Sequence, residues 1–457
     1  MSKKKSARTI PAREVALLTL LRVEQEEAYA NLALKQELTH HALQEADRRL
    51  VSEVVYGSLR MRAALDDLLN SLLHQPLDTL SPPIRQILRL SLYQLLYLER
   101  LPAAAVVHQA VEMAKRYGHK GTAALVNGVL RAFLRQDAQA MLPDESDPRA
   151  YLSTTLSYPL WLVDDLLARW PARDVITFCR YHNQHQGLDV RVNTLRVSRE
   201  ELLAQFAAAG IAAQAGLYAP EALIVSAGGG LLPPQLERGQ FIVQGQASQL
   251  AAHALNPVPG SKVIDLCAAP GGKATHLAQL MQNRGEIVAV DLHPHRARLI
   301  EESAERLGIS IIQALAADGR ELPAQFHGTA DYLLLDAPCS GLGVLGRRAD
   351  ARWRKQPSDI QELAALSLEL LHAAAAYLKP GGYLLFTTCT ITEEENVGNV
   401  ARFLAARRDF QPAPMMKLAG LLPDAADQRV ALDGSIQLLP QKHGLEGFYL
   451  SLMRKKA

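Results

Sequence analysis

Short apolar segments alternate with amphipathic segments from about residue 245 to the end of the chain. The apolar segments have the length of strands and lie at 262–266, 286–290, 310–315, 332–335 and 383–386. Segments with helical periodicity lie between these apolar segments, at 275–281, 295–307 and 360–378. This alternation predicts a largely parallel, doubly wound α/β sheet with helices on both faces. Because ligands bind beyond the carboxyl ends of the strands in such sheets, the residues after each strand are the first candidates for a site.

The residues before this sheet divide into two further regions. Residues 1–140 carry apolar stripes of helical period, for example Ile84, Ile87 and Leu88 behind a Ser81 cap and two prolines, which predicts an all-helical bundle. A polar linker follows, and then helices mixed with short strands at 188–192 and 222–225, which indicates a small α+β module. We therefore expect a helical domain at 1–140, a linker with an α+β module at 141–240, and an α/β domain at 241–457.

Composition excludes several classes of protein. The chain has 457 residues, of which 48% are hydrophobic and 21% charged, as in ordinary globular proteins. It lacks both the apolar run of a membrane span and the apolar stretch of a signal peptide, so we expect a cytoplasmic protein. The four cysteines have the spacing of neither a disulfide framework nor a zinc site. We expect Cys179, in an apolar stretch, to be an ordinary core residue.

Small residues and acids follow the first three strands of the predicted sheet. Asp291 ends the second strand and suits the hydroxyls of a ribose, and Asp318 follows the third and could accept from an adenine amino group. Either aspartate alone could equally cap a helix or form a turn. Together they favour an adenosine-type ligand. The first strand leads into a loop that fits neither a Walker motif nor a Gly-x-Gly-x-x-Gly motif; it consists of Cys267, Ala268, Ala269, Pro270, Gly271, Gly272 and Lys273.

Two cysteines follow the fourth and fifth strands. Cys339 comes three residues after Asp336, and Cys389 follows Thr387 and Thr388. A core cysteine more often lies within a strand than beyond it, and a thiolate at the ligand-binding edge is a nucleophile. The pattern therefore predicts covalent chemistry by a pair of thiols beside the adenosine-type ligand. The spacing leaves open which cysteine attacks.

These motifs resemble a known family. The strings DLCAAPGGK, LLLDAPCSGLG and TTCTITEEEN closely resemble the RsmB/Sun (Fmu) family of 16S rRNA cytosine-C5 methyltransferases. Further likeness covers nearly the whole chain, including GSLR at 57–60, LVNGVLR at 125–131, RVNTL at 191–195 and FIVQGQAS at 241–248. The resemblance implies an all-α NusB-like RNA-binding domain, a small α+β middle module and a Rossmann-like methyltransferase domain that uses S-adenosylmethionine.

The resemblance also implies a role for each site residue. The activity would be methylation of carbon 5 of a specific cytidine in 16S rRNA through a covalent adduct between cysteine and carbon 6. Cys389 would be the nucleophile, Cys339 would assist product release, and Asp336 would activate the base. DNA cytosine-5 methyltransferases instead attack with the Pro-Cys thiol. The cofactor would contact the loop 267–273 together with Asp291, Asp318 and Asp336.

The sequence departs from the family pattern at a few positions and leaves two alternative functions. Thr390 stands where the family usually has Ser, Gly245-Gln246 replaces an acidic pair, and Glu446 replaces Asp. The alternatives are a tRNA cytosine-C5 methyltransferase and a non-catalytic RNA-binding assembly factor. The NusB-like region argues against the first, and the intact cysteines argue against the second. We expect a monomer that binds 16S rRNA and neither a metal nor a membrane.

Basic residues with an interleaved aromatic follow the Pro-Cys loop. Such a cluster suits phosphate contact and base stacking, although a solvated helix face has the same composition. Residues 1–140 carry 19 Lys and Arg against 14 Asp and Glu, an excess of 5. We expect the target base to leave its stack to reach the thiols. The predicted RNA contacts are Arg347, Arg348, Arg352, Trp353 and Arg354.

Overall fold

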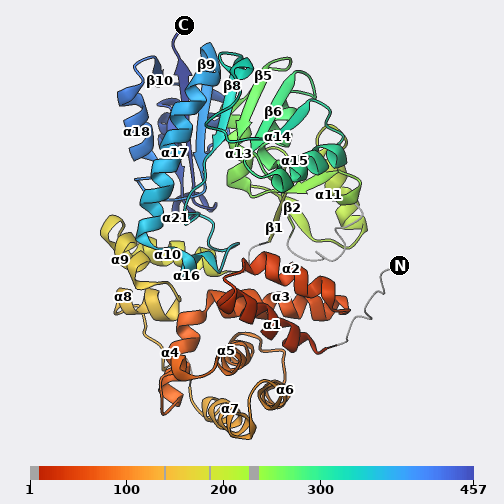
Figure 1. Ribbon diagram of the computed structural model, residues 1–457, viewed down its shortest axis with the longest axis vertical. Coiled ribbons are helices and arrows are strands. Elements are labelled where there is room, and N and C mark those ends of the chain that lie inside the picture. Colours follow the sequence, from red (N-terminus) through yellow and green to blue (C-terminus); the bar gives the residue numbers. More distant parts are fainter. Residues whose placement is uncertain (1–9, 138–139, 185–186, 226–235) are drawn as a thin grey trace. The chain divides into compact units, whose positions relative to one another are not determined.

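The computed structural model describes residues 10–137, 140–184, 187–225 and 236–457 (Figure 1). The chain forms two compact units. Unit 1 contains the residues up to Gln184 together with Leu345–Arg354, and unit 2 contains His185–Val344 and Lys355–Ala457. The division therefore falls at Gln184 rather than near 140, and unit 1 also takes a segment from the second half of the sequence.

Unit 1 is all-helical, as the sequence predicts. Helix α5 begins behind Ser81 with proline in its first turn, and its residues Ile84, Ile87 and Leu88 are completely buried. They pack with apolar residues of α1, α3, α4 and α7 in one core. The first seven helices are α1 (Ala12–Gln25), α2 (Ala30–His40), α3 (Glu45–Arg60), α4 (Arg62–Leu72), α5 (Pro82–Tyr97), α6 (Ala103–Tyr117) and α7 (Lys120–Phe133).

The last helices of unit 1 come from the region 141–240, which was expected to be a linker followed by an α+β module, and from the segment Leu345–Arg354. Leu162 and Phe178 lie in the expected module, and both are completely buried in unit 1. Cys179 is also completely buried, so its interpretation as a core residue is confirmed. The helices are α8 (Pro148–Ala150), α9 (Leu160–Arg169), α10 (Ala172–Asn183) and α16 (Ala351–Arg354).

Unit 2 begins with a small antiparallel sheet in the order β2-β3-β1-β4. Two of its strands have the predicted bounds, Leu188–Val192 for β1 and Ala222–Val225 for β3. Helix α11 (Arg199–Ala208) starts with a capping box, in which Ser198 and Glu201 bond each other's backbone N–H groups. Its Leu202 and Phe206 pack on this sheet. The remaining strands are β2 (Ala213–Ala215) and β4 (Phe241–Val243).

The larger sheet of unit 2 has the strand order β10-β12-β9-β8-β5-β6-β7, with β11 paired to β12. The five predicted strands are present and mutually parallel, whereas the three C-terminal strands pair antiparallel. The strands are β5 (Lys262–Leu266), β6 (Glu286–Asp291), β7 (Ile312–Ala316), β8 (Ala330–Asp336), β9 (Leu378–Thr388), β10 (Phe410–Pro412), β11 (Ser435–Leu438) and β12 (Phe448–Lys455).

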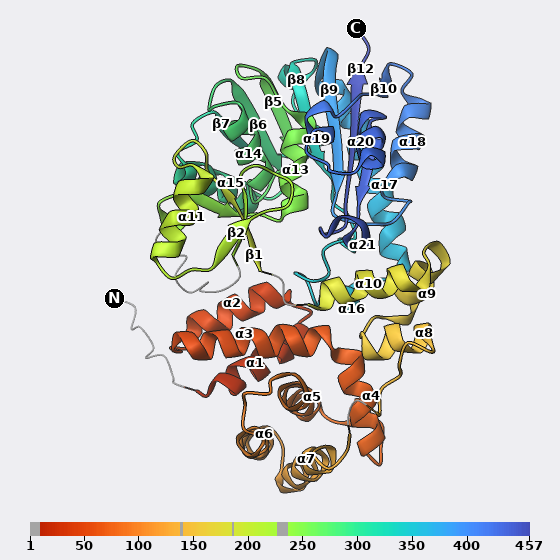
Figure 2. The same cartoon turned by 180° about the vertical axis from the view of Figure 1, so that it is seen from behind.

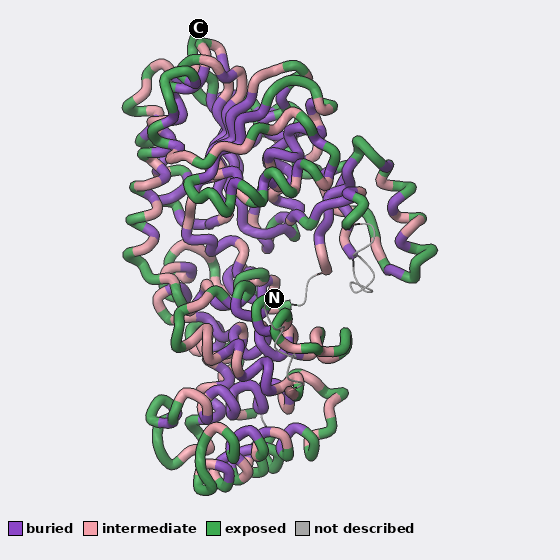
Figure 3. Tube along the Cα trace, turned by 45° about the vertical axis from the view of Figure 1, so that its right-hand side comes forward, coloured by how far each residue is buried: buried purple, intermediate pink, exposed green. Residues whose placement is uncertain are grey.

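Helices cover both faces of this sheet, and the side chains along each strand divide between two cores. In β5, Val263 belongs to one core and Ile264 and Leu266 to the other, because successive side chains point to opposite faces. The buried strands form the interior of the unit in Figure 3. None of the helices described is both long and apolar enough to cross a membrane. The covering helices are α13 (Gln246–Leu255), α14 (Gly272–Leu280), α15 (Pro294–Leu307), α17 (Pro357–Tyr377), α18 (Val397–Ala406), α19 (Met416–Ala419) and α20 (Ala425–Leu432) (Figures 1 and 2). The short helix α21 (Pro440–His443) follows β11 in the sequence.

Candidate active site

The two cysteines that follow β8 and β9 lie side by side. These strands are parallel neighbours in which Asp336 stands opposite Thr387, so the loops that follow them leave the sheet at the same edge. The Sγ atoms of Cys339 and Cys389 are 3.4 Å apart, and both side chains are partly buried. The structure therefore brings together the two thiols that the sequence placed at adjacent strand ends.

A single carboxylate holds the two cysteine loops together. Glu395 is completely buried, and its Oε1 accepts from the backbone N–H of Ser340 at 2.6 Å. Its Oε2 accepts from the hydroxyls of Ser340 at 2.6 Å, Thr390 at 3.2 Å and Thr392 at 2.6 Å. Ser340 follows Cys339 and Thr390 follows Cys389, so Glu395 fixes the residue after each thiol. Burying a carboxylate is costly unless donors surround it, and four donors meet that need here.

Neutral hydrogen bonds support the same loops. Asn396 accepts from the Thr388 hydroxyl at 2.5 Å and donates to the carbonyl of Thr390 at 3.2 Å, so it binds on either side of Cys389. The backbone N–H of Gly343 donates to the carbonyl of Cys389 at 3.0 Å, which links the Pro-Cys loop directly to the other cysteine. Both thiols thus project from loops whose backbones are fixed.

An ion pair lies beside the thiols at the end of β8. The Lys273 ammonium donates to Asp336 Oδ2 at 2.6 Å, and the Thr387 hydroxyl donates to Asp336 Oδ1 at 2.9 Å. Lys273 comes from the loop after β5, so three strand ends contribute to this group. Burial acts to lower the pKa of Lys273, but the charges of Asp336, Cys389 and Asp265 outweigh it and the pKa is raised. A permanent cation therefore accompanies Asp336 and Cys389.

The surroundings of Cys339 and Cys267 raise the pKa of each side chain and favour its thiol form. The pKa of Cys339 is raised well above its usual value, first by its hydrogen bond to Cys389, then by burial and by the negative charges of Cys389, Glu395 and Asp336. Burial, together with the acids around it, raises the pKa of Cys267 to about 12. Since the thiolate is the nucleophilic form, Cys267 is not equipped to attack a substrate.

The loop after β5 presents its backbone to the edge of the sheet. Cys267 has φ 61° and Gly271 has φ 97°, both in the left-handed region, and a Cβ at Gly271 would lie 3.2 Å from the Cα of Ile300. Asp291 is 3% exposed and accepts from the N–H groups of Ala269 at 3.3 Å and His293 at 3.2 Å. Asp291 therefore braces this loop at the end of β6, where the sequence predicted it.

Asp265 and Asp318 also lie near this loop, and their surroundings shift their pKa values in opposite directions. Asp265 is completely buried with no hydrogen-bond partner for either carboxylate oxygen, and burial followed by the charge of Asp336 raises its pKa well above the usual value. Asp318 instead forms an ion pair with Arg320, whose terminal nitrogen lies 2.8 Å from Asp318 Oδ2. That hydrogen bond lowers the pKa of Asp318. Asp265 thus has unpartnered oxygens near the loop, whereas Asp318 is already paired with a cation.

One predicted RNA contact is wrong. Arg352 is completely buried in unit 1, where its guanidinium lies 3.9 Å from the centre of the Tyr158 ring. It donates to the carbonyls of Arg60 at 3.1 Å and Ser157 at 3.0 Å, and to Asn183 Oδ1 at 3.0 Å. A guanidinium used in this way cannot reach a phosphate. Its role is to anchor the segment Leu345–Arg354 in the helical unit.

The neighbours of Arg352 divide between structural and exposed positions. The Trp353 indole N–H donates to the carbonyl of Leu59 at 2.6 Å, and its ring lies under Arg62, so it is not free to stack on a base. Arg347, Arg348 and Arg354 are exposed, and Arg354 lies over the ring of Tyr29. These three arginines stay predictions as RNA contacts.

Comparisons with known proteins match each of the regions that the sequence predicted. Residues 252–454 match the family described as 16S rRNA methyltransferase RsmB/F, residues 10–135 match the NusB family, and residues 158–230 match the ferredoxin-like domain of RsmF/B-like methyltransferases. The probable ribosomal RNA small subunit methyltransferase B of Bacillus subtilis is 39% identical over 97% of this chain and 98% of its own. The chain belongs to the RsmB/F methyltransferase family.

Further relatives agree with this assignment. The probable ribosomal RNA small subunit methyltransferase B of Synechocystis sp. is 35% identical over 98% of this chain and all of its own length. The crystal structure of PH0851 superposes with a TM-score of 0.81 and 27% identity, over 98% of this chain and all of that one. The order of a helical NusB region, a ferredoxin-like middle domain and a methyltransferase sheet is therefore that of RsmB/F proteins.

Gly245 and Glu446, at which the sequence was expected to depart from the family pattern, lie close together. A Cβ at Gly245 would collide with the carboxylate of Glu446. Gly245 therefore leaves the space that this carboxylate occupies.

One cluster of unit 2 has the side chains of a metal site. The ligand atoms of Glu221, His253 and His276 converge, and all three residues are buried. Glu221 Oε1 lies 2.8 Å from His253 Nε2, which is a hydrogen-bond separation, and it also pairs with His276. The buried Arg191, whose pKa burial lowers to about 9 against the opposing charge of Glu221, already supplies a positive charge. We interpret the cluster as a hydrogen-bonded network.

The sequence did not indicate two residues that shape the site. Lys273 was predicted only as part of a cofactor loop, yet its ammonium binds Asp336. Glu395 lies in the string TTCTITEEEN and had no predicted role, yet it joins both cysteine loops. Each role depends on contacts across at least 55 residues of sequence, as between Ser340 and Glu395. Only the position of Glu395 soon after Cys389 gave a local signal.

Proposed function

We propose that this chain uses S-adenosylmethionine to methylate carbon 5 of a cytidine in 16S rRNA, with Cys389 as the covalent nucleophile. The observation that carries the proposal is the 3.4 Å approach of Cys389 and Cys339 beside the Lys273–Asp336 ion pair. Membership of the RsmB/F family and the names of the relatives support rRNA as the substrate.

The residues around the loop after β5 fit S-adenosylmethionine. This loop brings its backbone to the sheet edge, and Asp291 at the end of β6 suits the ribose hydroxyls, as Asp318 suits the adenine amino group. The two oxygens of Asp265, buried without partners, offer acceptors to a ligand with N–H donors. The cofactor would supply an electrophilic methyl group. The residues that would hold it are Cys267, Ala268, Ala269, Pro270, Gly271, Gly272, Lys273, Asp291, Asp318 and Asp336.

The charges around the two thiols favour Cys389 as the nucleophile. Lys273 is coupled electrostatically to Cys389, and a nearby ammonium favours a thiolate. The pKa of Cys339 is instead raised by its hydrogen bond to Cys389, by burial and by nearby negative charges that include Glu395, which favours its thiol form. One thiol is therefore suited to attack, and the other is suited to donate or accept a proton during product release.

The proposed reaction passes through a covalent adduct between Cys389 and the target cytosine. The Cys389 thiolate forms a bond to carbon 6 of cytosine, and the electrons of the 5,6 double bond move to carbon 5, which becomes nucleophilic towards the methyl group. Asp336 would accept a hydrogen bond from the exocyclic amine and so orient the base, while the Lys273 ammonium beside it would stabilise the negative charge that develops on the ring. A base then removes the proton on carbon 5, the 5,6 double bond forms again, and the Cys389 thiolate leaves.

The RNA must deliver one base to this edge of the sheet. A cytosine inside a duplex exposes neither carbon 6 to a thiol nor carbon 5 to a methyl donor, so the target is flipped out or single-stranded. The exposed Arg347, Arg348 and Arg354 carry charge suited to the phosphates around such a base.

Labelled methyl transfer tests the proposal. The purified chain is incubated with labelled S-adenosylmethionine and either unmethylated 16S rRNA or tRNA, and the modified base is mapped. We expect label in one 5-methylcytidine of the rRNA. Label in tRNA alone would replace the substrate with tRNA, and binding of rRNA without transfer to either RNA would indicate a non-catalytic assembly factor.

A further inference from the structure

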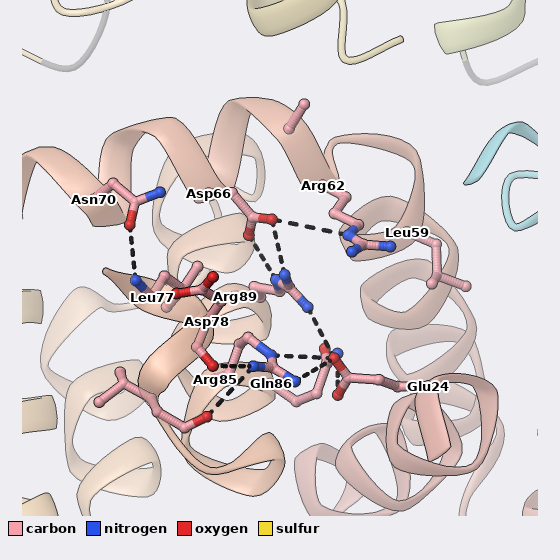
Figure 4. A network of polar contacts seen from close by, with 12 residues as sticks. Glu24, Leu59, Arg62, Asp66, Asn70, Leu77, Asp78, Arg85, Gln86 and Arg89 are labelled. Carbon is pink, nitrogen blue, oxygen red and sulfur yellow. Dashed lines mark hydrogen bonds and ion pairs between the residues drawn. The ribbon is translucent and has the colours of Figure 1, made fainter. Parts of the chain in front are cut away.

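The arginines between α4 and α5 of unit 1 show what a guanidinium needs when it is removed from water. Arg89 is 6% exposed, and it binds both carboxylate oxygens of Asp66, at 2.6 and 2.8 Å (Figure 4). Arg85 lies 2.8 Å from the carboxylate of Glu24 in the same network. Each of these arginines thus has an acid beside it, which offsets the cost of burying its charge.

Arg191 of unit 2 is buried among uncharged acceptors instead. Its side chain is completely buried, and its Nη1 donates to the carbonyl of Gly272 at 2.6 Å and to the side chain of Gln244. Its Nη2 donates to the Thr275 hydroxyl at 3.0 Å. Arg191 comes from β1, whereas Gly272 and Thr275 lie in the first turn of α14. The guanidinium therefore joins the small antiparallel sheet to the beginning of this helix.

The stability of α14 does not account for a cation at this place. The amino end of a helix carries a partial positive charge, so an acid or a small polar residue stabilises it and a cation does not. A buried guanidinium also costs free energy of desolvation, which an apolar side chain at the same place would avoid. Arg191 therefore serves a requirement other than packing or helix formation.

A second charged residue of the small antiparallel sheet holds the same helix. Arg191 stands opposite Ala222 on β3, and Glu221 directly precedes Ala222 in the sequence. Glu221 pairs with His276, which lies one helical turn after Gly272. The charge of Glu221 also acts favourably on the Arg191 guanidinium. Two successive turns of α14 are thus held by neighbouring side chains of opposite charge from the small antiparallel sheet.

The held turn contains Lys273, whose ammonium lies at the other side of the loop. Lys273 directly follows Gly272, and its Nζ donates to Asp336 Oδ2 at 2.6 Å. The carbonyl of Gly272 belongs to the planar peptide unit that leads to Lys273. A hydrogen bond that fixes this carbonyl therefore fixes the plane of the peptide and the direction in which the Lys273 side chain leaves the backbone.

We propose that Arg191 is a positioning residue of the methyl-transfer site, which acts through the backbone of Gly272 to hold the cofactor loop and the Lys273 ammonium in place. The proposal rests on the proposed function, because it depends on Lys273 favouring the thiolate of Cys389. The small antiparallel sheet thereby takes part in the chemistry without touching the reacting atoms.

Three variants of the full chain test this role. Arg191→Met removes every donor and keeps an apolar stem, whereas Arg191→Lys keeps one charged donor and is the milder change. Asn193→Ala is the matched control. Asn193 is also buried and also joins the small antiparallel sheet to the rest of the unit, but it donates to the carbonyl of Leu307 at the end of α15, at 2.9 Å, and not to α14. Thermal melting checks the folding of each variant.

Two measurements need neither RNA nor methyl transfer. The rate of Cys389 alkylation against pH, followed by mass spectrometry, reports the charge near that thiol. Arg191→Met should move this profile to higher pH by about one pH unit, because a displaced ammonium stabilises the thiolate less. Equilibrium dialysis should show that the Kd for labelled S-adenosylmethionine rises on the order of tenfold. Arg191→Lys should fall between Arg191→Met and the wild type, and Asn193→Ala should leave both measurements unchanged.

A double-mutant cycle with Lys273→Met separates positioning from packing. If Arg191 acts through Lys273, Arg191→Met should not move the Cys389 alkylation profile further once Lys273 has been replaced. In the methyl-transfer assay, Arg191→Met should likewise lower kcat much less in the Lys273→Met background than in the wild type.

Four outcomes would overturn the role of Arg191. An unchanged alkylation profile in folded Arg191→Met would show that Lys273 does not depend on it, and additive effects with Lys273→Met would show that the two residues act independently. An equal shift in Asn193→Ala would mean that any attachment of the small antiparallel sheet has the same effect. Failure of both Arg191 variants to fold would leave Arg191 a structural residue.

The proposed function fails separately from this inference. If the wild type transfers no methyl group to 16S rRNA, that reaction is wrong. Alkylation of Cys389 and binding of S-adenosylmethionine still show whether Arg191 positions Lys273 and the cofactor loop.

Discussion

At the scale of single residues, the site depends on one carboxylate as much as on its two thiols. Glu395 positions both cysteine loops, and its charge helps to keep Cys339 protonated. One residue thus acts both on the positions of the two cysteine loops and on the pKa of Cys339. Neither property could be predicted from the motif around each cysteine taken alone.

Glu395→Gln should lower methyl transfer on the order of 10–100-fold with little change in the KM for RNA. The amide keeps the size of the side chain but turns one acceptor into a donor, which opposes the N–H and hydroxyl groups of Ser340. Loss of the negative charge should also lower the pKa of Cys339. The rate of Cys339 alkylation against pH, followed by mass spectrometry, measures this shift.

Glu394→Gln is the matched control, because Glu394 is the exposed neighbour of Glu395. It should leave both the transfer rate and the alkylation profile as in the wild type. If Glu395→Gln lowers the rate but leaves the alkylation profile of Cys339 unchanged, Glu395 acts on loop geometry alone.

Replacement of Cys389 and replacement of Cys339 should affect different steps of the methyl transfer. Cys389→Ala removes the proposed nucleophile and should reduce transfer by on the order of a thousandfold or more without forming an adduct. Cys339→Ala should allow the attack but slow release, so that protein cross-linked to RNA accumulates on denaturing gels. An active Cys389→Ala together with a dead, adduct-free Cys339→Ala would exchange the two roles.

At the scale of elements, the segment Leu345–Arg354 joins the helical unit through polar contacts as well as packing. Asp350 accepts from the backbone N–H of Ala30 at the start of α2, at 3.2 Å. Arg352 and Trp353 donate to carbonyls at the end of α3, a position where free acceptors need partners. The segment therefore satisfies the ends of two helices that lie about 300 residues earlier in the sequence.

Arg352→Met should destabilise unit 1 by about 2–4 kcal/mol. The substitution keeps an apolar stem but leaves the carbonyls of Arg60 and Ser157 and the amide oxygen of Asn183 without their donor. Chemical denaturation followed by circular dichroism measures the loss. Arg354→Met is the control: it removes an exposed contact with Tyr29 and should cost no more than about 1 kcal/mol. Equal costs for the two variants would contradict the anchoring role.

His182 should make unit 1 sensitive to acid. Its Nδ1 accepts from the N–H of Gly346 at 3.2 Å, and burial, assisted by the charge of Arg352, lowers its pKa to about 3. An unfolded histidine titrates near 6.5, so the unfolded state binds the extra proton as the pH falls from about 6.5 towards 3. The free energy of unfolding should therefore decrease over this window, by up to about 1.4 kcal/mol per pH unit.

His182→Asn gives the comparison, because its amide oxygen can replace Nδ1 as an acceptor and does not titrate. Between about pH 7 and pH 5, above the range of most carboxylates, the variant should show a flatter dependence of unfolding free energy on pH. Parallel profiles for the two proteins would show that His182 does not carry the effect.

Sequence patterns located elements better than they assigned them to units. The bounds of β1, β3 and β5 were predicted to the residue, because alternating or consecutive apolar residues distinguish each segment from its flanks. The antiparallel pairing of β12 with β9 was not predicted, since partner strands leave no local trace. Arg352 was predicted to contact RNA for a similar reason. The sequence alone does not distinguish a basic residue that faces solvent from one that is buried in a folded core.

At the scale of the whole molecule, the sequence predicted three domains and the structure forms two compact units. The helices after residue 140 pack with the first helices, so the linker expected there is part of unit 1. The ferredoxin-like region spans the division, because α9 and α10 belong to unit 1 whereas β1, β3 and α11 belong to unit 2. Units defined by packing therefore do not follow family boundaries in this chain.

Because the chain returns to unit 1 at Leu345, two separate parts of the gene encode the helical unit. A gene fragment that ends at Gln184 encodes every helix of unit 1 except the one that carries Arg352, so its product would lack the donors for α3 and the cap of α2. A synthetic peptide of residues 345–354 should then bind and stabilise that fragment. A single recombination point therefore could not transfer the whole helical unit from one protein to another. The two units should be inherited together.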